Sequence, residues 1–174
     1  MTELQDSAVL VPLFRDREAA VRLVVIRRAA GGLHGGQLAF PGGKRDAGDA
    51  TLQATALREA REEIGLDPAA VTVLAALPAV EVRVTGHRIS PFLARIVRPP
   101  EWRADPREVA EVLEVPLAEL ARPESRGESL EHFAPWPEPR LIEYYRVGPH
   151  RLWGASFRIL EPLLPRLLAG EWAI

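Results

Sequence analysis

Three glutamates close together in the chain have the types and the spacing that could do chemistry. Glu59, Glu62 and Glu63 stand at positions i, i+3 and i+4, so a helix places all three carboxylates on one face. Ala60 and Ile64 then lie on the opposite face, which can pack against a sheet. Carboxylates this close repel one another, and a hard divalent cation such as Mg²⁺ or Mn²⁺ offsets the repulsion because it prefers oxygen ligands.

A glycine-rich segment precedes these glutamates. Residues 29–48 contain seven glycines, too many for a regular element, so the segment is expected to be a loop. The successive residues Gly42 and Gly43 allow backbone amides and carbonyls to approach a metal or a phosphate without obstruction by side chains. An acidic helix alone also fits a solvated face of mixed charge, but the glycine pair beside it favours a metal–phosphate site.

The pattern of apolar residues indicates the elements that must position this loop and helix. We expect a helix over residues 49–64, with Asp49 as its N-cap and Gly65 as its C-terminal stop. A closing helix is expected over residues 160–168, with Pro162 in its first turn. Strands are expected over residues 8–14, 21–27, 71–77, 87–97, 109–115, 141–147 and 151–153.

These elements predict an α/β protein, specifically an α/β/α sandwich with a mixed central sheet. The length of 174 residues is near that of one domain, and no linker or internal repeat divides the chain. Residues 1–174 are therefore expected to form a single domain. The proline-rich segment 123–139 is expected to run irregularly over its surface.

Composition narrows the classes of function. The chain has no cysteine, which excludes disulfides, thiolate nucleophiles and cysteine-bound metals and favours the cytoplasm. Its 22 basic and 24 acidic residues give a net charge of −2, without the concentrated basic surface that favours binding of long nucleic acids. No apolar run approaches the ~20 residues of a membrane helix, so we expect neither nucleic acid nor membrane as a partner.

The loop and helix together resemble the Nudix box, G-x5-E-x7-R-E-U-x-E-E-x-G-U, where U is a bulky apolar residue. Gly43 matches the first glycine, and residues 58–66 match the second half, with alanine at the first apolar position. Asp49 stands in place of the first glutamate, and eight residues rather than seven separate it from Arg58. The resemblance implies a Nudix fold and metal-dependent hydrolysis of a nucleoside diphosphate linked to another group.

The chain also resembles the coenzyme A pyrophosphatase branch of that family, whose additional signature is L-L-T-x-R-S-x3-R-x3-G-x3-F-P-G-G. The matching positions over residues 23–43 are Leu23, Arg27, Gly36 and Phe40-Pro41-Gly42-Gly43. Arg28 and Gly32 replace the expected serine and second arginine. The branch implies cleavage of coenzyme A or its thioesters to 3′,5′-ADP and 4′-phosphopantetheine. The two replacements keep ADP-ribose, NADH or another nucleoside diphosphate derivative as alternative substrates, and a nucleotide-binding module without catalysis as a remote alternative.

The resemblance also implies roles for individual residues. Glu59 and Glu63 would be the principal ligands of Mg²⁺ or Mn²⁺. Glu62 would join through a second ion or through water, and the Gly42 carbonyl would complete the shell. Arg58 is expected to orient the carboxylates.

Other residues are candidates for the general base and for substrate binding. Glu62 and Glu108 are the candidate bases, with Glu111 as the neighbouring rival of Glu108. A small-molecule nucleotide is the expected partner, and its candidate binding residues are Arg27, Gly43, Lys44 and Arg88. Core packing and a homodimer both explain the apolar closing helix and Trp172.

Overall fold

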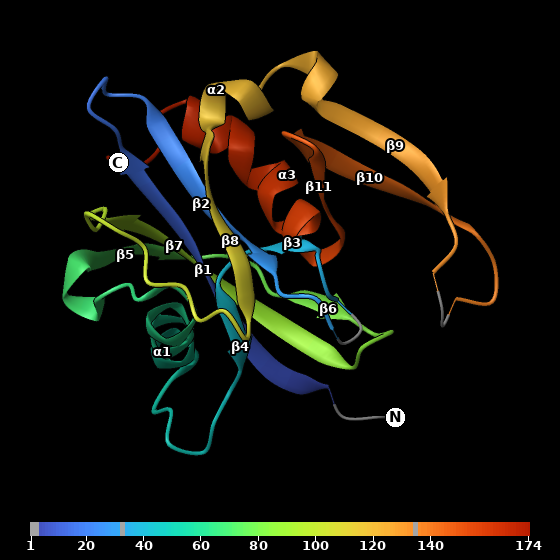
Figure 1. The fold of residues 1–174 in the computed structure, drawn as a ribbon, viewed down its shortest axis with the longest axis horizontal. Helices are drawn as coiled ribbons and strands as arrows, with labels where there is room; N and C mark the ends of the chain where they lie inside the picture. Colours follow the sequence, from blue (N-terminus) through green and yellow to red (C-terminus); the bar gives the residue numbers. More distant parts are fainter. Residues whose placement is uncertain (1–3, 32–33, 134–135) are drawn as a thin grey trace.

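Two β-sheets and three α-helices make up the part of the chain that the structure describes, residues 4–31, 34–133 and 136–174 of a computed structural model (Figure 1). The strands are β1 (Gln5–Arg15), β2 (Val21–Arg28), β3 (Leu38–Ala39), β4 (Gly42–Lys44), β5 (Val71–Ala76), β6 (Val80–Val82), β7 (His87–Ile96), β8 (Val109–Pro116), β9 (Arg126–Glu131), β10 (Arg140–Val147) and β11 (His150–Trp153). The helices are α1 (Leu52–Ile64), α2 (Leu117–Leu120) and α3 (Gly154–Leu168), with 3₁₀ turns η1 (Pro68–Ala70) and η2 (Pro123–Ser125). Each strand expected from the sequence is present, with ends shifted by a few residues at most.

The larger sheet is mixed, as the sequence predicts. Its main path runs β3-β2-β1-β7-β5, while β4 pairs with β1, β6 with β7 and β8 with β2. Strands β1 and β7 run parallel, and the other pairs are antiparallel. The loop expected over residues 29–48 is therefore interrupted by β3 and β4, and that prediction is wrong for residues 38–39 and 42–44. The reason is that the glycine pair lets the backbone of β4 lie against β1.

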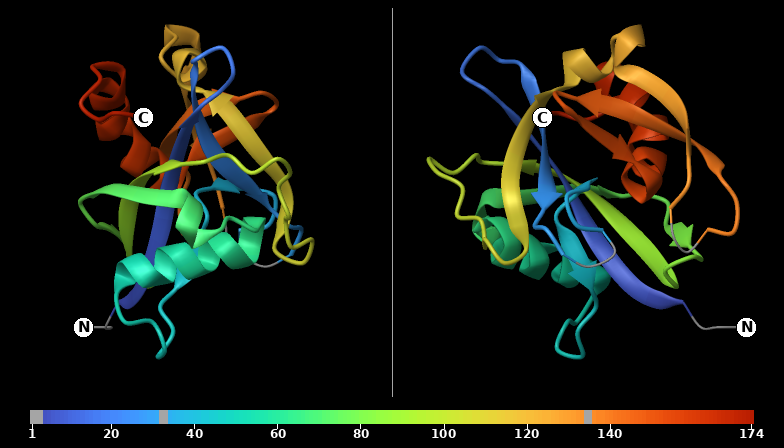
Figure 2. Two further views of the ribbon diagram at one scale, coloured as in Figure 1. Left: turned by 90° about the vertical axis from the view of Figure 1, so that its left-hand side faces the viewer. Right: turned by 45° about the vertical axis from the view of Figure 1, so that its right-hand side comes forward.

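Alternating side chains of the central strands supply two separate hydrophobic cores. In β1, Leu10 and Phe14 belong to the core that includes α1, whereas Val11 and Leu13 belong to the core that includes α3. Strand β2 repeats this alternation, as the two-residue period of a strand requires. Helices α1 and α3 consequently cover opposite faces of the sheet (Figure 2). This arrangement is the α/β/α sandwich predicted from the sequence.

A second sheet, with strand order β11-β10-β9, lies on the α3 side and is not predicted by the sequence. The expectation that residues 123–139 run irregularly is wrong for residues 126–131, which form β9 antiparallel to β10. Gly127 of β9 lies directly opposite Tyr144 of β10, and a Cβ on Gly127 would come within 2.7 Å of the tyrosine ring. Cross-strand packing of this kind stabilises a strand whose own composition does not indicate one.

Helix α3 begins at Gly154, six residues before the helix predicted over residues 160–168. Pro162 and Pro165 consequently lie inside the helix, where neither can donate an intrahelical hydrogen bond. Phe157 and other apolar side chains of α3 are buried in the core, and this packing outweighs the missing bonds. Neither α3 nor any other helix among the described residues is both long and apolar enough to cross a membrane.

Candidate active site

Helix α1 begins after Thr51 rather than after Asp49. The Thr51 side chain accepts a hydrogen bond from the Ala54 amide at 3.1 Å, and Gly65 ends the helix in the left-handed conformation with φ of +69°. The prediction of Asp49 as N-cap is therefore wrong, because Asp49 lies outside the cap and turns toward Arg58. The prediction of Gly65 as the stop is confirmed.

The three glutamates of α1 lie in three different environments. Ala60 and Ile64 are buried against the sheet as predicted, and Glu63 is buried beside them, only 1% exposed. The Glu59 side chain is 14% exposed and the Glu62 side chain 53% exposed. The spacing along the helix therefore produces a gradient from a buried acid to a solvated one.

The glycine pair of β4 lies directly against the two less exposed carboxylates. The Gly42 N–H donates to a carboxylate oxygen of Glu63 at 2.8 Å. A Cβ on Gly43 would lie 2.5 Å from the Glu59 carboxylate, and a Cβ on Gly42 would lie 2.3 Å from the Ala8 carbonyl of β1. Any side chain at either position would displace one of these neighbours, so both glycines are needed for β4 to lie between β1 and α1. We call the contact of Gly42 and Gly43 with Glu59 and Glu63 the clamp.

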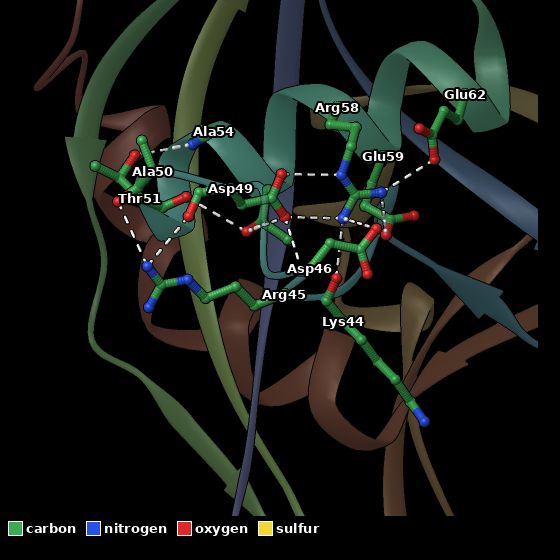
Figure 3. A network of polar contacts seen from close by, with 11 residues as sticks. Lys44, Arg45, Asp46, Asp49, Ala50, Thr51, Ala54, Arg58, Glu59 and Glu62 are labelled. Carbon is green, nitrogen blue, oxygen red and sulfur yellow. Dashed lines mark hydrogen bonds and ion pairs between the residues drawn. The ribbon is translucent and has the colours of Figure 1, made fainter.

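Arg58 connects the acidic residues around this clamp (Figure 3). Its guanidinium donates to both carboxylate oxygens of Asp49, at 3.0 and 2.9 Å. The same group donates to Glu59 at 2.9 Å and to Glu62 at 3.0 Å. It also donates to the Lys44 carbonyl at the end of β4, at 3.0 Å. One side chain therefore fixes three carboxylates and the glycine-bearing strand relative to one another.

The position of Asp49 explains how this chain accommodates its departure from the Nudix spacing. Asp49 is 8% exposed and accepts hydrogen bonds from the Asp46 amide at 3.0 Å and the Thr55 hydroxyl at 2.9 Å. Pairing with Arg58, together with these hydrogen bonds, holds the pKa of Asp49 well below its usual range. An acid with a shorter side chain, one residue farther from Arg58 than in the motif, thus forms an ion pair with Arg58.

Burial disfavours the ionised forms of the two carboxylates beside the glycine pair. Burial raises the pKa of Glu63 to about 8, with the charge of Glu108 adding to the effect and the charge of Arg28 opposing it. Burial also raises the pKa of Glu59, against the opposing hydrogen bond from Arg58. Two neighbouring acids whose negative charge is poorly compensated form an environment that a divalent cation would stabilise.

The three candidate bases lie in different places. Glu108 is exposed in the turn before β8, and its charge raises the pKa of both glutamates beside the glycine pair. Glu111 lies on β8 and pairs with Arg27 at 3.2 Å. Glu62 is held by Arg58 at the solvated edge of α1. Of the three, Glu108 is the candidate outside α1 whose charge acts on Glu59 and Glu63, whereas Glu111 is paired with Arg27.

The candidate substrate-binding residues lie on both faces of the larger sheet. Gly43 faces Glu59, so the side chain of the next residue, Lys44, leaves the opposite face. Figure 3 shows Lys44 extending away from the network around Arg58. Arg88 is exposed on β7. Of these candidates, Gly43 lies in the clamp, whereas the side chain of Lys44 extends away from it.

Alternation in β2 also separates Arg27 from the acidic helix. Ile26 packs in the core that includes α1, so Arg27 lies on the opposite face and Arg28 on the α1 face. The charge of Arg28 accordingly acts on Glu63. Arg28, one of the cations considered for a substrate phosphate, therefore lies on the same face as the glutamates, as the alternation of the apolar residues in this strand indicates.

The donors beside the glycine pair suit a hard cation. Within residues 4–31, 34–133 and 136–174, no three histidine, aspartate or glutamate side chains are arranged as a metal-ligand set. Glu63 accepts the Gly42 N–H, which points away from β1, and Glu59 lies against the neighbouring Gly43. In a strand, the carbonyl of a residue points to the same edge as its N–H. Two carboxylates and this carbonyl are hard oxygen donors, which fit Mg²⁺ or Mn²⁺.

Comparison with known proteins points in the same direction as the geometry. The family described as NUDIX domain matches residues 4–136. A protein named uncharacterized Nudix hydrolase NudL from Salmonella newport is 40% identical over 148 residues, covering 79% of this chain and 70% of its own. The crystal structure of the Nudix hydrolase RenU from M. smegmatis superimposes with a TM-score of 0.66 at 19% identity, covering 100% of this chain and 91% of its own. The NUDIX domain of Shewanella oneidensis NrtR, complexed with ADP ribose, has a TM-score of 0.52 at 18% identity, covering 68% of this chain and 76% of its own.

Proposed function

This chain belongs to the Nudix family, and on that premise we propose that it hydrolyses the pyrophosphate bond of coenzyme A or its thioesters. The products are 3′,5′-ADP and 4′-phosphopantetheine or its acyl derivative. The family itself supports the broader statement that the chain is a Nudix pyrophosphohydrolase acting on a nucleotide derivative. The observation that carries the chemistry is the position of Glu59 and Glu63 against the glycine pair of β4.

The choice of coenzyme A rests on the segment upstream of the helix. Leu23, Arg27 and Gly36 match the coenzyme A signature, and the signature ends in the Phe-Pro-Gly-Gly sequence that forms the clamp. Arg28 replaces its serine, and Gly32, which replaces its second arginine, lies outside the described residues. These two replacements favour ADP-ribose or NADH as the second candidate substrate. The intact glutamates of α1 argue against a module that binds a nucleotide without cleaving it.

We assign the metal to the clamp. Glu59 and Glu63 would hold Mg²⁺ or Mn²⁺ with the Gly42 carbonyl, and Glu62 would act through water or a second ion. When bound, the ion neutralises charge on the anhydride and lowers the pKa of water. Arg58 holds the carboxylates in place, and the missing side chain at Gly43 lets the backbone of β4 lie directly against Glu59.

We assign the general base to Glu108. Hydrolysis joins the oxygen of water to one phosphorus, breaks the bridging P–O bond and passes a proton from the water to a base. The Glu62 carboxylate is already engaged by the Arg58 guanidinium, whereas Glu108 lies in an exposed turn and its charge acts on Glu59 and Glu63. Glu108→Gln should lower kcat about 100-fold. Glu111→Gln should keep the wild-type kcat, and an unchanged kcat in Glu108→Gln would return the role to Glu62.

The remaining assignments are the domain, the compartment and the assembly. We propose that residues 1–174 form one domain, because α3 and strands of both sheets share a hydrophobic core. A cytoplasmic location is proposed from the absence of cysteine.

Trp172 packs against the core and lies beneath the Arg166 guanidinium, which is 4.6 Å from the centroid of the Trp172 ring. Core packing therefore accounts for Trp172, and a homodimer stays a prediction.

The experiment is a comparison of substrates at a fixed Mg²⁺ concentration. The protein is incubated separately with coenzyme A, ADP-ribose and NADH, and the products are separated and quantified by chromatography. We expect the largest kcat/KM for coenzyme A, with 3′,5′-ADP as a product. Cleavage of ADP-ribose with coenzyme A left intact would overturn the assigned substrate. Binding of all three nucleotides without cleavage would support the non-catalytic alternative.

A further inference from the structure

We propose that Ser7, Lys44 and His87 form an anion subsite for a phosphate monoester that the substrate carries away from the bond being hydrolysed. The three residues come from three neighbouring strands, β1, β4 and β7. The identity of the complete substrate rests on the proposed function, but occupation of the subsite requires no hydrolysis.

Strand pairing brings the three side chains into one row. Ser7 lies directly opposite Lys44 in the antiparallel pair of β1 and β4, and residues in such positions have Cβ atoms about 4.5–5.5 Å apart. The Ser7 hydroxyl is 3.0 Å from Nδ1 of His87. The row therefore runs from an exposed lysine through a buried serine to a half-buried histidine.

This row lies on the face of β4 opposite the carboxylates. Gly43 faces Glu59, and Ala8 packs in the core that includes α1. Their neighbours along the strands, Lys44 and Ser7, therefore face the other side of the sheet. Figure 3 shows the Lys44 side chain leaving the acidic network in this direction. An anion on the row would thus be separated from the glutamates by the backbone of β4.

The chemistry of the row suits an anion. When the Ser7 hydroxyl donates to Nδ1, the neutral imidazole of His87 carries its proton on Nε2 and can donate it to a ligand. Lys44 adds up to three donors and a full positive charge. Burial lowers the pKa of His87 and the charge of Lys44 lowers it further, while a hydrogen bond with the Gln5 backbone opposes this and the charge of His34 adds a smaller lowering. A bound anion would relieve this crowding of positive charge.

A phosphate monoester is the ligand class that uses these donors most fully. It carries close to two negative charges near neutral pH and three acceptor oxygens. Coenzyme A has such a group at its ribose 3′ position, whereas ADP-ribose and NADH do not. The subsite would therefore make an additional phosphate, rather than the anhydride common to all three molecules, the feature that distinguishes the preferred substrate.

The test measures binding without turnover. Metal-free protein in EDTA is titrated calorimetrically with 3′,5′-ADP and with adenosine 5′-monophosphate, which differ only in the 3′-phosphate. Because a hydrogen bond to a charged group contributes about 1.5–3 kcal/mol, 3′,5′-ADP should bind at least ~10-fold more tightly. Lys44→Ala and His87→Gln should each remove most of this advantage, and Lys44→Arg should restore part of it. The matched control His132→Gln, in an exposed position after β9, should keep it.

Equal affinity of the wild-type protein for the two nucleotides would overturn the subsite. Retention of the full advantage in both Lys44→Ala and His87→Gln would also overturn it. A failure of the proposed function gives a different result: if coenzyme A is not hydrolysed but the 3′-phosphate still increases affinity in a way that depends on Lys44, the subsite is supported and only the reaction must be reassigned.

Discussion

The two faces of strand β4 differ in charge and in the way that they are built. On the α1 face, Gly43 meets the Glu59 carboxylate with no space for a Cβ atom. On the other face, Lys44 is exposed near the half-buried His87. Because side chains alternate along a strand, two successive residues separate an acidic region from a basic one. A three-residue strand can therefore keep a metal and a distal phosphate apart without either charge cancelling the other.

The largest expected effect comes from removing charge on the acidic face. Glu59→Gln or Glu63→Gln keeps the size of the side chain but replaces a negative oxygen donor with a neutral amide. Since a bound metal contributes several kcal/mol to stabilisation of the transition state, kcat should fall by at least ~100-fold. Steady-state kinetics with the best substrate at saturating Mg²⁺ measures this change.

The control for these variants is Glu119→Gln, which makes the same chemical change at an exposed position of α2. It should retain wild-type kcat, and the circular dichroism of all three variants should match that of the parent. Near-normal turnover in both Glu59→Gln and Glu63→Gln would remove the metal from this face of β4.

A smaller effect is expected from adding a methyl group where β4 contacts α1. Gly43→Ala places a methyl group where the Glu59 carboxylate lies, at 2.5 Å, so the carboxylate must move. A shift of about 1 Å in an active-site group can lower the rate up to ~100-fold, and we expect kcat to fall 10- to 100-fold. Gly48→Ala is the matched control, because nothing lies within 4 Å of a Cβ there. If the two alanine variants have the same kcat, the close approach of Gly43 has no role in catalysis.

The acidic face of β4 could be predicted from the sequence because the residues that form it lie close together in the chain. The spacing of Glu59, Glu62 and Glu63 along one helix, and the glycine pair shortly before it, both lie within a short segment. What the spacing could not predict is how deeply each carboxylate is buried. Glu63 lies at the boundary of the apolar face, and only contact with the sheet decides that it turns inward.

The basic face of β4 could not be predicted in the same way because the residues that form it lie far apart in the chain. Ser7 and His87 are 80 residues apart in the chain and meet only because β1 and β7 pair in parallel. The N-cap illustrates the same limit. Asp49 and Thr51 are both good cap residues, and the ion pair of Asp49 with Arg58, nine residues away, decides between them.

The last expected effect concerns stability rather than rate and separates burial of Glu63 from its role in catalysis. The pKa of a glutamate is about 4.5 when exposed, and that of Glu63 is raised to about 8. The folded protein therefore binds more protons than the unfolded chain between these values, so the free energy of unfolding must fall as pH rises through this window. Below about pH 4.5 this penalty is absent because Glu63 is protonated in both states.

Denaturant unfolding of metal-free protein at pH 5 and pH 8 measures the effect, with Glu63→Gln beside the wild type. The glutamine oxygen can still accept the Gly42 hydrogen bond but does not ionise, so the variant should lose less stability between the two pH values. At about 1.4 kcal/mol per pKa unit, the difference should reach a few kcal/mol, with Glu119→Gln behaving as the wild type. An inactive variant that is more stable than the parent at pH 8 would mean that the buried carboxylate is kept for metal binding at the expense of stability. Identical pH dependence in Glu63→Gln and the wild type would mean that water or a counter-charge already compensates Glu63, and the acidic face would then need no metal to offset its burial.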